Sequence, residues 1–232
     1  MIVTKKWFVV CLVALSMMIV SAAPSSAGKI KSFSADQVTL APGGQVENST
    51  KLYITPDKMR MDMHPPQGEG DMIMILRQDR DIQWTLNPNN KAYVEKPLNQ
   101  KEWEQMAKGM IKSTDEKDLG TEKVNGFKCR KKSVEMVIEV MGYKTKTRSI
   151  VWISKQLDIP IRTQSEDGRI TELRNIKKGK QPSKLFTVPG GYKKVANMME
   201  LFSGPGQGNS GGMSIPEGLS DKLKNFKFPK NQ

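Results

Sequence analysis

Cysteine and histidine are nearly absent from this chain, which has two cysteines and one histidine among 232 residues. Metal sites built from these residues, and folds held by several disulfides, need more of both. The mean hydropathy of −0.51 is too low for a protein that crosses a membrane many times. Charged residues make up 26% and hydrophobic residues 37% of the sequence, which is typical of a folded globular chain.

The N-terminus has the pattern of a secretory signal peptide. A pair of lysines precedes an apolar run over residues 7–20, which is short against the roughly 20 residues that span a bilayer. Small residues, Ser25 and Ala27, then stand at the −3 and −1 positions of a cleavage site. We expect residues 1–27 to be removed on export and the mature protein to lie in the periplasm. An uncleaved anchor is the alternative.

Apolar and polar residues alternate with period two through most of the mature chain, with turn residues at short intervals. This pattern predicts an antiparallel meander. The first expected strands are residues 33–40, 46–54, 59–63, 72–77, 82–86 and 91–96. Later expected strands are residues 119–124, 129–141, 144–153, 159–165 and 170–176. Between two of them, Asn125-Gly126 is the strongest hairpin signal of the chain.

A helix is expected where the first group of strands ends. Asn99 fits its N-cap, and Glu102 follows three residues later, as a capping box requires. Apolar residues then recur at helical spacing, at Trp103, Met106, Ala107, Met110 and Ile111. These elements predict a mostly β (α+β) fold, a curved antiparallel half-barrel with helices covering its concave face. The strand pattern fits an open sheet and a closed barrel equally well.

The expected boundaries are a signal peptide over 1–27, the half-barrel domain over 28–195 and a tail over 196–232. A short amphipathic helix at the start of the tail is predicted by the apolar residues Val195, Met198, Met199 and Phe202. Residues 203–213 are rich in glycine and predict a flexible linker.

Methionine is abundant, with 15 in the chain. Met59, Met61 and Met63 alternate along one expected strand, so their side chains must point to one face. Where the next strand forms a hairpin with it, Met72 and Met74 join the same surface. Flexible thioether side chains re-pack around irregular apolar guests, so this surface fits a lipid or acyl chain.

The apolar stripe of the expected helix would supply a second wall opposite these strands. The candidate ligand-binding residues are Met59, Met61, Met63, Met72, Met74, Trp103, Met106 and Met110. Two other interpretations remain open. The methionines can simply fill a core, as methionine stripes commonly do, or they can hold Cu(I) together with the adjacent His64.

Catalytic patterns are weak. Residues 208–212 match G-x-S-x-G, but they lie in the glycine-rich linker with no strand before them, so the strained turn of such a motif is absent. His64 is the only histidine that could act as a base. We therefore expect no enzyme activity, no catalytic residue, no metal and no cofactor.

Basic residues exceed acidic ones by 37 to 24, and the formal net charge is +13. The densest runs, over 128–132, 144–148 and 177–184, are either solvated outer faces or surfaces for anionic lipid head groups or an acidic envelope partner. Nucleic acid is not expected, because the chain has no binding motif for it. Cys129 lies in the first run, and burial in a strand is the more common fate of such a residue than reactivity.

Three blocks of sequence resemble a known family. They are LGTEKVNGFKC at 119–129, WISKQLDIP at 152–160 and LFTVPGGY at 185–192, joined by Lys58-Met59-Arg60-Met61. Together they resemble an uncharacterised exported bacterial family with a domain of unknown function, similar to the outer-membrane lipoprotein carrier superfamily (LolA-like and LolB-like proteins). The resemblance covers roughly residues 33–195 and excludes the tail.

This resemblance implies an incomplete antiparallel barrel whose apolar concavity is covered by helices. It also implies binding or sensing of lipid or lipoprotein acyl chains in the periplasm. The sequence thus predicts a periplasmic, non-enzymatic protein that binds lipid or lipoprotein acyl chains. The alternative from another class is an envelope protein–protein interaction module with a filled core.

Overall fold

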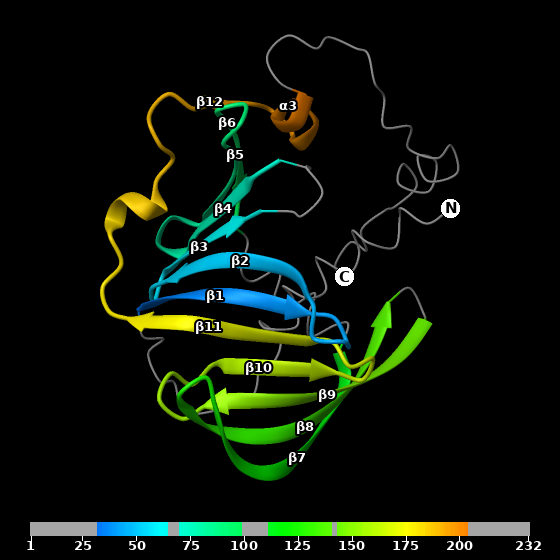
Figure 1. Cartoon of the computed structure of the whole chain (residues 1–232). Coiled ribbons are helices and arrows are strands. Elements are labelled where there is room, and N and C mark those ends of the chain that lie inside the picture. The colour runs from blue at the N-terminus through cyan, green and yellow to red at the C-terminus, as the bar shows by residue number, and fades with distance from the viewer. Residues whose placement is uncertain (1–31, 65–69, 99–110, 141–142, 204–232) are drawn as a thin grey trace.

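A single twelve-stranded sheet forms the body of the protein (Figure 1). The computed structural model describes residues 32–64, 70–98, 111–140 and 143–203. The strands are β1 Phe33–Leu40, β2 Val46–Ile54, β3 Lys58–Met63, β4 Met72–Arg77, β5 Ile82–Asn87, β6 Ala92–Pro97, β7 Ile111–Val124, β8 Phe127–Val140, β9 Tyr143–Ser154, β10 Pro160–Ser165, β11 Ile170–Lys178 and β12 Lys193–Lys194. Their order across the sheet is β12-β6-β5-β4-β3-β2-β1-β11-β10-β9-β8-β7.

The sheet is an open, curved meander, as Figure 1 shows. All neighbouring strands pair antiparallel except the short β12, which pairs parallel with β6. The pairing that joins the two halves brings β1 beside β11, with Leu40 opposite Ile170. The mostly β fold with a curved antiparallel sheet is therefore confirmed. The sequence fits an open sheet and a closed barrel equally well, and the structure has the open sheet.

Strand β7 differs from the prediction at its start. The sequence places Ile111 at the end of a helix and the next strand at 119, but β7 begins at Ile111 and pairs with β8 almost along its whole length. Ile111 lies opposite Ile138, so pairing with a distant strand outweighs the local helical spacing of this residue. The rest of the expected helix, residues 99–110, lies outside the described residues.

Helices are few in the described ranges. They are η2 Gln78–Arg80, η3 Ser183–Phe186 and α3 Met198–Ser203. A helical cover over the concave face is therefore not found within them. No helix of the described ranges is long and apolar enough to cross a membrane.

The hairpin between β7 and β8 confirms the predicted turn. Asn125 and Gly126 both have positive φ, 47° and 86°, as the two central residues of a type I′ turn require. The Asn125 side chain also donates a hydrogen bond of 2.8 Å to the carbonyl of Leu173 in β11. The turn is thereby fixed against the middle of the sheet.

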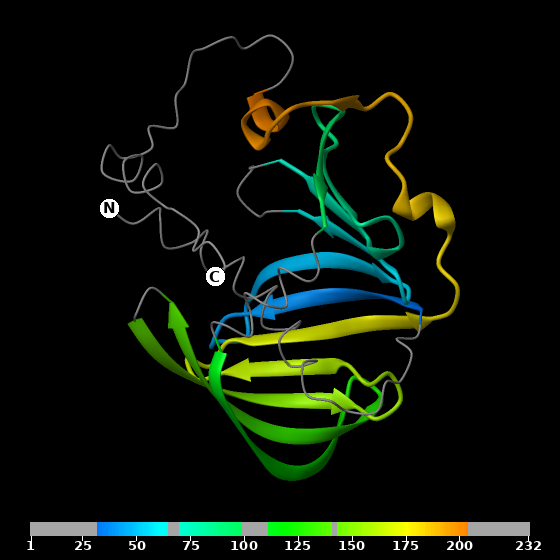
Figure 2. The same ribbon diagram turned by 180° about the vertical axis from the view of Figure 1, so that it is seen from behind.

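The C-terminal strap, residues 182–203, passes around the end of the sheet that holds β3 to β6 (Figures 1 and 2). Its first part, η3, packs Phe186 against Ile75, Trp84 and Leu86 on one face. Its middle part, β12, extends the sheet edge beside β6. Its last part, α3, packs Leu201 on the other face of the same strands.

The prediction of which residues form the buried face of the helix in this strap is partly wrong. The sequence assigns Val195, Met198, Met199 and Phe202 to its apolar face, yet Met199 is 75% and Phe202 40% exposed. Leu201 is the residue that is fully buried, against Ala92 and Val94 of β6. The side-chain amides of Asn87 and Asn90 donate to the Leu201 carbonyl, and these bonds fix the rotation of the helix. The packed chain thus reaches beyond residue 195.

Candidate functional site

Five methionines on β3 and β4 share one face of the sheet, here named the methionine face: Met59, Met61, Met63, Met72 and Met74. Directly opposite residues of paired strands have their side chains on the same side. Met61 lies opposite Met74, and Met63 lies opposite Met72. The hairpin that the sequence requires for this arrangement is present, so the structure brings together all five predicted strand residues.

Aliphatic residues extend the methionine face on both strands that flank it. On β2, Leu52 lies opposite Met61 and Ile54 lies opposite Met59. On β4, Leu76 completes the alternation that begins with the methionines. These three residues are not among those that the sequence pattern predicted for the site. The period-two alternation of β2 and β4 predicts which residues of each strand share a face. It does not predict which residues lie opposite the methionines, because the register is set by pairing between strands.

The opposite face of β3 and β4 is covered by the strap. Arg60 points to that side, and its guanidinium donates to the Leu185 carbonyl at 3.1 Å and to Asp62 at 2.6 Å. Arg77, which is buried, donates in the same way to the Phe186 carbonyl at 2.9 Å. The charged side chains of β3 and β4 therefore lie away from the methionine face.

The carboxylate of Asp79 completes this attachment of the strap. It accepts two hydrogen bonds of 2.7 Å from the Arg77 guanidinium. These bonds, with the charges of Arg77 and Lys58, lower the pKa of Asp79 to about 2. The ion pair is thus formed throughout the physiological pH range, and it keeps Arg77 directed at the strap.

The methionine face is half-buried, with Met61 packed against the core cluster that contains Leu52, and the face behind it carries a separate packed cluster around Ile75 and Phe186. All five methionines keep part of their surface accessible, while Ile75, Leu86 and Phe186 on the opposite side are almost completely buried. Within the described residues, α3 is the element that packs on the methionine side of this half, and it lies over β5 and β6. An apolar, adaptable surface of this kind fits an apolar ligand.

The three helical members of the predicted site are not placed. Trp103, Met106 and Met110 lie outside the described residues, so their role as a second wall stays a prediction.

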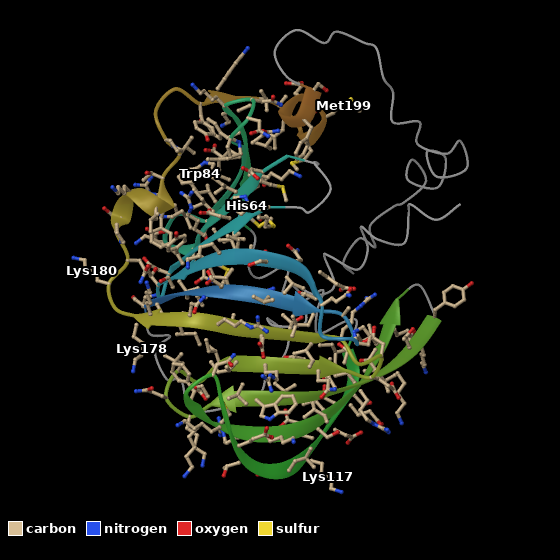
Figure 3. The ribbon with its side chains drawn as sticks, in the orientation of Figure 1. His64, Trp84, Lys117, Lys178, Lys180 and Met199 are labelled. Atoms are coloured by element: carbon tan, nitrogen blue, oxygen red, sulfur yellow. The ribbon has the colours of Figure 1, made fainter. Side chains whose placement is uncertain are left out.

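His64 lies at the end of β3, next to Met63 in sequence. Its ring, labelled in Figure 3, is exposed, and Nδ1 lies 2.8 Å from Oδ1 of Asp71. Within the described ranges, no group of three or more histidine, cysteine or acidic residues is arranged to hold a metal ion. The Cu(I) interpretation depends on the thioethers alone and stays a hypothesis.

Cys129 is completely buried in the largest core cluster, among residues that include Val124, Trp152 and Leu157. Burial raises the pKa of its thiol above the ordinary value. A protonated thiol without access to solvent is a poor nucleophile, so the structural interpretation of this cysteine is the one that its surroundings favour.

Fold and site together define a protein with an open, curved β-sheet and one apolar face lined by methionine. The chain belongs to the family described as Domain of unknown function (DUF4412), which matches residues 37–159, more than half of the sequence. This match includes the methionine face. No curated protein matches the chain.

Several solved structures show a distant similarity to this chain. An uncharacterized conserved protein from Thermus thermophilus is 12% identical, with a TM-score of 0.49, over 79% of this chain and 99% of that one. The lipoprotein LppX of Mycobacterium tuberculosis is 14% identical, with a TM-score of 0.38, over 75% and 95%. LprF from Mycobacterium bovis is 12% identical, with a TM-score of 0.39, over 77% and 98%. Likenesses this distant transfer no function.

Proposed function

We propose that this protein binds the acyl chain of a lipid or lipoprotein on its methionine face, without catalysis, after export to the periplasm. One observation supports this above the others. Five thioether side chains gather on one half-buried face of β3 and β4, while the other face of the same strands is covered by the strap. The accessible surface is therefore apolar on the side where a ligand can lie.

The energetics of such a face suit reversible binding. Each acyl carbon that leaves water contributes about 0.8 kcal/mol, so part of one chain is enough for measurable affinity. Methionine has three rotatable bonds and a polarizable sulfur, so the face can follow chains of different shape. A carrier or sensor must also release its ligand, and a surface that is open on one side permits this.

The test is native mass spectrometry of protein purified from periplasm without detergent. Met61→Ser/Met74→Ser removes the directly opposed pair at the centre of the methionine face. Met136→Ser/Met199→Ser is the matched control, because Met136 lies on β8 and Met199 on α3. We expect a lipid-sized adduct, removable by organic solvent, on the wild type and the control variant, and its loss from the first variant.

Circular dichroism of both variants must show an intact sheet for this comparison to hold. An adduct that persists on Met61→Ser/Met74→Ser would contradict the proposal. So would a wild-type protein that stays free of lipid after incubation with vesicles, and that result would favour a filled core.

A second candidate, a protein–protein interaction module, has one observation in its favour. Met199 and Phe202 are large apolar residues exposed on α3, at the end of the described chain. Met199→Ser/Phe202→Ser would then abolish association with a purified envelope partner and leave the bound lipid unchanged. Retained association with simultaneous loss of lipid would exclude this candidate.

A further inference from the structure

One end of the sheet has a concentration of lysines without acidic partners. Here the β7–β8 turn, the β9–β10 turn and the end of β11 lie close together, because Asn125 bonds to Leu173 and the Lys155 amide donates to the Lys128 carbonyl. The strap begins at the same end. The exposed lysines of this basic end are Lys123, Lys128, Lys155, Lys178, Lys180 and Lys184.

None of these six lysines makes an ion pair within the described residues. Two acidic residues of this end are engaged by other cations. Asp158 pairs with Arg130 at 3.0 Å, and Asp57 pairs with Lys58 at 3.1 Å. Residues 173–199 contain no acidic residue at all. The positive charge of the basic end is therefore left uncompensated by the protein itself.

Arginine and lysine have different roles in this molecule. Seven of the eight arginines form ion pairs, and Arg80 is the exception in the described chain. The rigid guanidinium fork suits fixed partners of defined geometry, whereas the lysine ammonium is a mobile point charge. A set of lysines on flexible stems fits a fluid array of negative charges better than a single shaped partner.

We infer that the basic end docks on the surface of a bilayer that contains anionic phospholipid. Charge complementarity is the first argument, since clustered lysines are attracted to such a surface within the Debye length. The choice of a membrane over an acidic protein rests on the proposed function, because a protein that binds acyl chains must collect or deliver them at a bilayer.

The docking is electrostatic and peripheral. The large exposed apolar residues lie elsewhere, with Val46 and Tyr143 at the opposite end of the strands. Figure 3 shows Lys178 and Lys180 directed outward on the side of the strap. Lys117 lies apart from them on β7 in the same view. Binding should therefore weaken steeply with salt and need no insertion into the hydrocarbon.

The test is co-sedimentation of the full-length mature protein with vesicles of phosphatidylcholine, with and without about one-third phosphatidylglycerol. Lys178→Gln/Lys180→Gln/Lys184→Gln removes three charges of the basic end. Lys91→Gln/Lys112→Gln/Lys117→Gln removes the same charge from exposed lysines at the other end or in the middle of the strands and is the matched control. Each lysine near an anionic surface strengthens binding roughly fivefold, so the first variant should bind at least tenfold more weakly.

The control variant should stay within about twofold of the wild type, and about 0.3 M salt should abolish binding of all three proteins. Equal weakening of both variants would show that only net charge matters and would overturn the assignment to this end. Absence of wild-type binding to anionic vesicles would also overturn it, and an acidic protein would then be the remaining partner for these lysines.

The same measurement on Met61→Ser/Met74→Ser separates this inference from the proposed function. Vesicle docking should persist in that variant although its bound lipid is lost. The lysine variant, in contrast, should lose docking and keep the lipid that it carries after purification. Loss of docking in Met61→Ser/Met74→Ser would contradict an electrostatic surface and show that the methionine face itself makes the contact.

Discussion

Glu172, with 3% of its surface exposed, is the most deeply buried charged residue in the described chain. Its two carboxylate oxygens bind different arginines, Arg174 and Arg162, each at 2.6 Å. Burial alone would raise the pKa of Glu172, but the hydrogen bonds and charges of the two arginines outweigh it and lower the pKa. The pair of arginines is thus what makes a charge tolerable at this depth in the sheet.

Glu172→Gln should lower the free energy of unfolding by about 1–3 kcal/mol near neutral pH, because both arginines lose a charged acceptor. A lowered folded-state pKa contributes stability above the ordinary value of 4.5, and this stability is lost as the pH falls through the lowered pKa. Urea unfolding at about pH 7 and about pH 3 should therefore show a smaller difference between wild type and variant at the lower pH.

Glu47→Gln is the control for this effect. Glu47 is exposed, and its contact with Arg169 is 3.6 Å, so its replacement should change stability by less than about 0.5 kcal/mol. An equal effect at both positions would show that burial of the carboxylate is irrelevant.

Cys129 should not react with a thiol reagent in the folded protein. Its side chain is completely buried, and its pKa is raised by that burial. Labelling with iodoacetamide should be absent under native conditions and complete in concentrated urea. Rapid native labelling would mean that the β8 end of the core opens, and it would revive the reactive interpretation of this residue.

At the scale of elements, the strap is the feature with the greatest consequence for the site. Its η3 turn buries Phe186, 1% exposed, against Ile75, Trp84 and Leu86. The two arginines that hold its carbonyls come from the same strands as the methionines. Because the strap occupies one face of β3 and β4, a ligand on these strands must use the other face.

Phe186→Ala should lower the free energy of unfolding by about 3–5 kcal/mol, because it leaves a cavity beneath the strap. The tryptophan fluorescence, to which Trp84 of this cluster contributes, should report the change during urea unfolding. Ser183→Ala, one turn earlier in η3 and exposed, should be neutral within about 0.5 kcal/mol. A mild effect of Phe186→Ala would show that the strap contributes little to the sheet.

Strand β7 shows how an open sheet protects its edge. Among the described strands it pairs with β8 alone, and almost every residue along it is exposed. Charged residues follow one another there, and a register shift next to Gly120, whose φ is 90°, interrupts the ladder. Charges and irregular pairing of this kind discourage further strands from adding to an edge.

For the whole molecule, the proposed ligand and the stability of the fold should be linked. A ligand that binds the folded protein at about 100 times its Kd adds roughly 2.7 kcal/mol to the free energy of unfolding. Delipidated protein should therefore gain about 5–10 °C in Tm on addition of a lysophospholipid. Calorimetry should show this gain for the wild type and for Met136→Ser/Met199→Ser, but not for Met61→Ser/Met74→Ser. Equal shifts in all three proteins would place the ligand elsewhere.

Much of the candidate site could be predicted from the alternation of apolar and polar residues along single strands. The alternation along residues 59–63 and 72–77 fixes which side chains share a face within each strand, because the strand repeat is two residues. The Asn125-Gly126 turn was equally predictable, since two consecutive positive φ values favour these residues. Such features depend only on neighbours in sequence.

The sequence by itself therefore determined most of the strands, the Asn125-Gly126 turn and the sharing of one side of β3 by Met59, Met61 and Met63. Tertiary structure decided the register that sets Leu52 beside Met61, the strand state of Ile111 and the burial of Leu201. It also decided that β1 pairs with β11, far away in the chain. These outcomes depend on contacts between distant segments, whose packing energy exceeds the small local preferences that a sequence pattern records.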